Sequence, residues 1–223
     1  MDSALLKDAL IKFFAGFSVI CLLLFIPAGT LNFWNAWLLI LLLFVPMFAA
    51  GIIMLFKNPE LLRKRLKNKE IQTEQKFVIL GSLIMFLTGF ILAGLNFRFK
   101  WHILPNYIII ISSIIFIFSY ILYAEVLREN VFLSRIIEVQ ENQKVIDSGL
   151  YGIVRHPMYS ATIFLFLSMP LILGSIFSFI IFLTYIPLIA KRIKNEEIFL
   201  EKNLEGYSDY KNKVKYKVIP FIW

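Results

Sequence analysis

The chain has 223 residues, of which 59% are hydrophobic and 16% aromatic, and its mean hydropathy is +0.77. Soluble domains are about 45–50% apolar, so this composition indicates a polytopic membrane protein. The formal net charge of +8 suggests nucleic-acid binding, but the basic residues lie in loops between apolar spans, which argues against that class and is instead a topology signal.

Four apolar segments in the first part of the chain are each near the length of about 20 residues that crosses a bilayer. They cover Leu10–Pro27, Trp34–Phe56, Phe77–Phe97 and Tyr107–Val126. A fifth apolar region, Ser160–Ala190, is too long for one ordinary span, and Pro170 and Gly174 bracket its middle. We expect two tightly joined helices that enter the membrane and return, with a single tilted helix as the alternative.

The expected fold is therefore all-α: a polytopic transmembrane bundle of about six membrane segments, with a C-terminal helical hairpin and short cytoplasmic C-terminal helices. If the N-terminus is cytoplasmic, every basic residue except Arg98 and Lys100 falls in a segment on the cytoplasmic side. This orientation requires an even number of crossings and so favours the hairpin. No cleavable signal peptide is convincing. We expect an integral inner-membrane protein whose termini and site face the cytoplasm.

The segment Pro59–Leu66, within the basic loop 57–76, places Leu61, Leu62 and Leu66 at helical spacing among basic residues. This pattern predicts a short amphipathic helix on the anionic inner leaflet. A solvated connector is the alternative.

Several kinds of site lack support in this sequence. Cys21 is the single cysteine, which excludes a disulfide framework, and His102 and His156 are the only histidines, so we expect no metal site. There is no G-x-G-x-x-G, no P-loop and no G-x-S-x-G motif.

The clearest polar constellation begins at Arg155-His-Pro-Met-Tyr159. Pro157 suits the first turn of a helix, which places His156 at the helix entry, where free N–H groups and the positive dipole end favour a carboxylate. The alternative is that Arg155 and His156 simply anchor the helix at the lipid headgroups.

A second constellation lies on the helix that is expected to leave the membrane. Arg192 and Glu196 are four residues apart and so share one helix face, either as part of a site or as an ordinary surface ion pair. Glu197 points about 100° away around the helix, and we expect it to be solvated or structural.

These pieces recur in an order that resembles a known family. They are Ser148-Gly-Leu-Tyr151, Arg155-His-Pro-Met-Tyr159, the apolar hairpin, Arg192, Glu196-Glu-Ile-Phe-Leu200 and Gly206-Tyr-Ser-Asp-Tyr210. Over about residues 130–223, the chain resembles the isoprenylcysteine carboxyl methyltransferase (ICMT) family and its phospholipid-methyltransferase relatives.

The resemblance implies an integral membrane methyltransferase that uses S-adenosylmethionine, with residues 1–127 forming four transmembrane helices and residues 128–223 the catalytic, cofactor-binding region. It implies that Arg192 faces the methyl acceptor. The cofactor positions that it implies are Gln140, Gln143, Lys144, Val145, Ile146, Tyr151, His156, Pro157, Met158, Tyr159 and Glu196.

An ionised carboxylate needs no general base at neutral pH, so an enzyme that methylates it has mainly to position and desolvate it. Arg192 suits that task because its guanidinium binds a carboxylate bidentately. We therefore expect carboxyl methylation of a prenylcysteine-like or other lipid-like acceptor, with membrane lipids as further partners. The alternatives are a phospholipid N-methyltransferase, a sterol-type NADPH-dependent membrane reductase and a non-enzymatic membrane protein.

Overall fold

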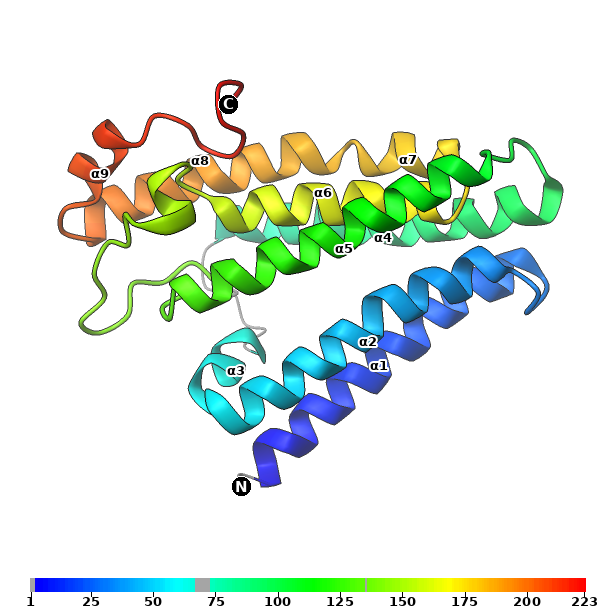
Figure 1. Ribbon diagram of the computed structural model, residues 1–223, viewed down its shortest axis with the longest axis horizontal. Coiled ribbons are helices and arrows are strands. Elements are labelled where there is room, and N and C mark those ends of the chain that lie inside the picture. Colours follow the sequence, from blue (N-terminus) through cyan, green and yellow to red (C-terminus); the bar gives the residue numbers. More distant parts are fainter. Residues whose placement is uncertain (1–2, 67–72, 135) are drawn as a thin grey trace.

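The computed structural model describes residues 3–66, 73–134 and 136–223, and these residues form helices and no β-strand (Figure 1). In chain order the helices are α1 (Ser3–Ala28), α2 (Trp34–Lys57), α3 (Pro59–Leu66), α4 (Thr73–Phe99), α5 (Asn106–Glu129), the 3-10 helix η1 (Gly149–Gly152), α6 (Pro157–Ile172), α7 (Ile176–Phe182), α8 (Tyr185–Asn203) and α9 (Tyr207–Lys213). The predicted all-α bundle is confirmed.

Within the described part of the chain, five helical segments are long and apolar enough to cross a membrane. They are α1, α2, Gln75–Phe99 of α4, α5, and Ile176–Asn203, which combines α7 and α8; α6 is a shorter apolar helix. Many of their apolar side chains point outward, such as Ile26 (68% exposed) and Phe118 (65% exposed). Exposed apolar surface on this scale is typical of helices that contact lipid.

The region Ser160–Ala190 forms two arms, as predicted. Gly174 has φ +73°, the left-handed conformation that ends α6, and its N–H donates to the carbonyl of Leu171 at 3.0 Å. Two buried amides satisfy carbonyls at this turn, because Asn35 donates to Ile172 at 2.9 Å and Asn96 donates to Gly174 at 3.5 Å. The chain then returns through α7 and α8 beside α6 (Figure 1).

The short helix α3 forms where the sequence predicts it, but its leucines pack inside the protein. Leu61 and Leu62 are each 5% exposed. Lys64 donates to the carbonyl of Val131 at 3.2 Å, and Arg65 donates to the carbonyl of Ser134 at 3.3 Å. The helix is therefore not a solvated connector, since it docks on the segment that follows α5, with Leu61 and Leu62 packed inside the protein and Leu66 partly buried.

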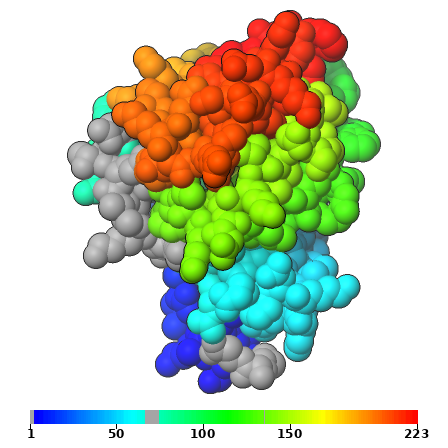
Figure 2. Space-filling model, turned by 90° about the vertical axis from the view of Figure 1, so that its left-hand side faces the viewer, coloured from blue at the N-terminus to red at the C-terminus, as the bar shows by residue number. Residues whose placement is uncertain are grey.

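The two ends of the bundle differ. The turns α1–α2, α4–α5 and α6–α7 lie at one end, whereas α3, α9, the segment between α5 and α6 and the last turns of α8 lie at the other (Figure 1). Figure 2 shows this second end as one continuous face, with the segment after α5 between α3 and the C-terminal segments. The segments predicted to share the cytoplasmic side thus gather at one end.

Helices α1 and α4 touch at Gly94, where a Cβ atom would lie 2.7 Å from the backbone oxygen of Leu24 and 2.9 Å from the Cβ of Pro27. A contact between backbones cannot be relieved by a rotamer change. Small residues allow transmembrane helices to pack at such short distances.

We expect Gly94→Ala to push α1 and α4 apart and to lower the free energy of unfolding by about 1–3 kcal/mol. Thermal unfolding in detergent measures the loss. Gly51→Ala in α2 is the matched control, because a Cβ there meets nothing within 4 Å. Equal unfolding temperatures for the two variants would contradict the proposed close contact.

Candidate active site

The entry of α6 is fixed by the C-terminal segment. His156 is the N-cap and Pro157 the first helical residue, as the sequence predicts. The backbone N–H groups of Arg155 and His156 donate to the carbonyls of Tyr216 and Lys217 at 2.9 and 2.8 Å. The Ser160 hydroxyl donates to the carbonyl of Val218 at 2.6 Å, so the first turn of α6 is held along one side.

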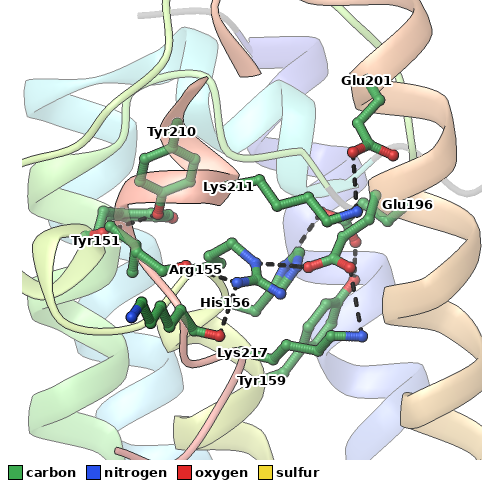
Figure 3. Close-up of polar contacts among 12 residues, drawn as sticks. Tyr151, Arg155, His156, Tyr159, Glu196, Glu201, Tyr210, Lys211 and Lys217 are labelled. Atoms are coloured by element: carbon green, nitrogen blue, oxygen red, sulfur yellow. Dashed lines mark hydrogen bonds and ion pairs between the residues drawn. The ribbon is translucent and has the colours of Figure 1, made fainter. Parts of the chain in front are cut away.

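A buried carboxylate joins this entry to α8. Glu197 is 4% exposed, and its Oε1 accepts from Arg155 Nε at 2.7 Å and lies 3.3 Å from His156 Nε2. Its Oε2 lies 3.4 Å from Lys217 Nζ. Figure 3 shows the side chains of Arg155, His156 and Lys217 close together at this place. The sequence leaves Glu197 as either solvated or structural, and its burial excludes the solvated alternative. The surrounding cationic groups allow this carboxylate to be buried, which supports a structural role.

The adjacent Glu196 takes part in a second polar chain. Tyr159 of α6 donates its hydroxyl hydrogen to Glu196 Oε2 (Figure 3). Arg192 Nε donates to the same hydroxyl at 2.9 Å. His156 Nδ1 lies 3.9 Å from Glu196 Oε1. Arg192 and Glu196 therefore share a helix face, as predicted, and Tyr159 connects them.

A pocket with an empty volume of about 830 Å³, part of it open to solvent, lies against this chain. The sequence-predicted residues that line it are Gln143, Lys144, Val145, Ile146, Tyr151, His156, Met158, Tyr159, Arg192 and Glu196. The structure thus brings together pieces that are far apart in the sequence.

Two predicted positions do not line the pocket. Gln140 lies in the wall segment, where its Nε2 donates to the carbonyl of Phe132 at 2.6 Å and its backbone N–H donates to Gln143 Oε1 at 2.8 Å. Pro157 is fully buried. Both residues therefore shape the site from behind its surface.

The pocket also contains residues that the predicted set leaves out. Leu200 and Leu204 follow Glu196 at intervals of four residues and extend its face along and just past α8, and Tyr207 and Tyr210 come from the G-Y-x-x-Y motif. The helical spacing and the motif are both readable in the sequence, and together they identify these four positions. Arg155 and Asn130 line the pocket as well.

The tyrosines on the pocket wall are uncharged hydrogen-bonding groups. Burial raises the pKa of Tyr151 to about 12, and its hydroxyl accepts from Asn130 Nδ2 at 3.0 Å. Burial likewise raises the pKa of Tyr210, which donates to the carbonyl of Tyr151 at 2.8 Å. Both hydroxyls remain protonated at neutral pH.

Tyr207 differs from its neighbours. It is 4% exposed and lines the pocket, yet its hydroxyl has no hydrogen-bond partner among the described residues. Buried polar atoms are almost always paired, so this hydroxyl is available to a bound molecule. The aliphatic walls, the Tyr207 hydroxyl, His156 and Glu196 suit a ligand that carries an aromatic ring, hydroxyls and an amino-acid group. Among the described residues, no group of three His, Cys, Asp or Glu side chains is placed to hold a metal ion.

We expect Glu197→Ala to leave Arg155 buried without its carboxylate and to lower the free energy of unfolding by about 3–5 kcal/mol. Chemical denaturation in detergent measures this loss. Glu201→Ala, which removes a partly exposed ion pair with Lys211, is the control and is expected to cost less than about 1 kcal/mol. A Glu197 variant as stable as the control would show that the buried carboxylate does not hold the site together.

Comparison with known proteins agrees with the resemblance seen in the motifs. No curated protein matches the chain. Residues 108–202, from α5 to the end of α8, match the model of the isoprenylcysteine carboxyl methyltransferase (ICMT) family. That segment contains most of the hairpin, the polar chain of Arg192, Tyr159 and Glu196, Glu197 with Arg155 and His156, and most of the pocket lining. The chain is therefore similar to the ICMT family over the region that carries its candidate active site.

Proposed function

We propose that the protein is an S-adenosylmethionine-dependent membrane methyltransferase that methylates the carboxylate of a prenylcysteine-like or other lipid-like acceptor. One observation carries this proposal. Within the segment that matches the ICMT family model, Arg192, Tyr159 and Glu196 form one hydrogen-bonded chain along the wall of a single pocket. A carboxylate, an arginine and a buried helix entry at one site suit a ligand of mixed charge.

The pocket supports the cofactor assignment. Glu196 accepts hydrogen bonds from an ammonium or ribose hydroxyl, and His156 at the entry of α6 favours a carboxylate. Val145, Ile146 and Tyr207 line an apolar wall that suits an adenine ring. When bound, S-adenosylmethionine supplies an electrophilic methyl group.

Arg192 is the proposed acceptor residue. Its guanidinium is oriented by the bond to Tyr159, and it binds a carboxylate without removing a proton from it. A carboxylate oxygen needs no base, and no residue of the pocket is required to act as one. The exposed apolar helices around the site suit an acceptor with a lipid tail.

We further propose that residues 128–223 form the catalytic region and that residues 1–127 form a transmembrane scaffold. The pocket end of the bundle and both termini face the cytoplasm in this proposal. The gathering of α3, α9 and the segment after α5 at one end supports it, because these segments belong to the basic parts of the chain.

The experiment that tests the function is incubation of the purified protein with methyl-labelled S-adenosylmethionine and either a membrane lipid extract or a farnesylcysteine analogue. Label recovered as an ester of the farnesylcysteine analogue supports the proposal. Label confined to phospholipid amines would instead assign N-methylation, and no transfer to either acceptor would refute the proposed class of acceptors.

We expect Glu196→Gln and Tyr207→Phe each to weaken the binding of S-adenosylhomocysteine, by about tenfold, because each removes a group available for a hydrogen bond to the cofactor. Isothermal titration calorimetry measures the affinities. Both substitutions keep the shape of the side chain, and the unfolding temperature serves as the control for structure. Unchanged affinity would remove the substituted residue from the cofactor site.

We expect Arg192→Lys to bind S-adenosylhomocysteine within about twofold of wild type but to transfer methyl groups at least about tenfold more slowly, because lysine cannot bind a carboxylate bidentately. The rate is followed with the labelled cofactor at saturating concentration. Full turnover in this variant would exclude Arg192 from the acceptor site.

A further inference from the structure

Gln75 is a fully buried amide at the start of α4. It is 0% exposed, although the segment that it begins, Gln75–Phe99, is otherwise apolar enough to cross a membrane. A polar side chain in such a place is costly unless its donors and acceptors are paired. Gln75 also lies outside residues 108–202, the part of the chain that matches the ICMT family.

The side-chain amide of Gln75 has one weak hydrogen bond, through its oxygen, and none through its nitrogen among the described residues. Its Oε1 lies 3.5 Å from Arg192 Nη1, at the long limit for a hydrogen bond, and its Nε2 has no hydrogen-bond partner within the described part of the chain. Exchanging the two amide atoms would turn an N–H group toward the guanidinium, so the contact to Arg192 itself favours the observed orientation. The NH₂ group of Gln75 therefore remains uncommitted beside Arg192.

Arg192 stands between Gln75 and the pocket. Its Nε is bound to Tyr159 of α6, and it lines the pocket, whereas Gln75 does not. The neighbouring Lys191 lies over the ring of Phe77, 4.1 Å from the centroid, so this turn of α8 packs along the outer surface of α4. Phe77 and Leu80 are 60% and 55% exposed, so α4 has an exposed apolar surface that lies about 140–200° around the helix from the buried Gln75.

We propose that Gln75 is a specificity-determining residue of the acceptor subsite. Its Nε2 donates to the carboxylate that Arg192 binds while the cofactor occupies the pocket. The two side chains together present donors in a buried setting, where an anion replaces the missing partner of the amide. This inference rests on the proposed carboxyl methylation.

If Gln75 only positioned Arg192, Gln75→Glu would bind the acceptor acid with wild-type affinity. Gln75→Glu keeps an acceptor for Arg192, and its carboxylate stays ionised beside the guanidinium. It removes the NH₂ donor and places a negative charge where the acceptor carboxylate is proposed to bind. Gln75→Met preserves the approximate shape of the side chain and removes both polar atoms.

The test measures equilibrium binding of farnesylcysteine and of its methyl ester to the full-length protein saturated with S-adenosylhomocysteine. We expect Gln75→Glu and Gln75→Met to weaken binding of the anionic acid at least about tenfold, with the ester and S-adenosylhomocysteine within about twofold of wild type. In the methyl-transfer assay with farnesylcysteine, we expect a raised KM for Gln75→Met. Gln75→Glu should also bind the anionic acid weakly, although it keeps an acceptor for Arg192.

Three results overturn the inference. Wild-type affinity of Gln75→Glu for the acid would leave Gln75 with a positioning role alone. A parallel loss of acid and ester binding would indicate general damage rather than recognition of the anion. If the wild-type protein neither binds nor methylates farnesylcysteine, the proposed carboxyl acceptor is wrong, and the role of Gln75 is overturned with it.

Discussion

The site depends on the buried carboxylate of Glu197. It is held by Arg155 and His156 from the entry of α6 and by Lys217 from the C-terminal segment. This one side chain therefore joins α8 to two other parts of the chain. Arg155 in turn donates to the carbonyls of Val214 and Lys215 at 2.6 and 2.9 Å. A buried charge tolerates few alternative arrangements, because any shift leaves it unpaired at a high cost.

Two adjacent glutamates thus have different tasks. Successive residues of a helix point about 100° apart, so fixing Glu197 toward the entry of α6 also fixes where Glu196 points. Glu196 is directed into the pocket, where Tyr159 links it to Arg192. The pocket end of α8 is therefore oriented by a contact outside the pocket, and its remaining face carries Leu200 and Leu204 into the wall.

Much of this architecture follows from the sequence. The four long spans, the hairpin at Gly174 and the helix entry at Pro157 depend on hydropathy and local backbone preferences, which act over a few residues. Most of the predicted site positions also line the pocket, and Arg192 and Glu196 do so from one face of α8, as their spacing predicts. The burial of Glu197 was not predictable, since it depends on a C-terminal segment distant in sequence that pairs with Arg155 and His156. The same holds for Gln75, which reaches Arg192 only through the packing of α4 on α8. Gln140 follows a pattern of polar residues, but a local turn directs its side chain to Phe132.

The most direct test of this account is an experimental structure of the protein with S-adenosylhomocysteine bound. The account predicts a single ligand at the pocket end of the bundle, in contact with His156 and Glu196 and within hydrogen-bonding distance of the Tyr207 hydroxyl. A ligand bound elsewhere, or one that contacts only His156 or only Glu196, would contradict it.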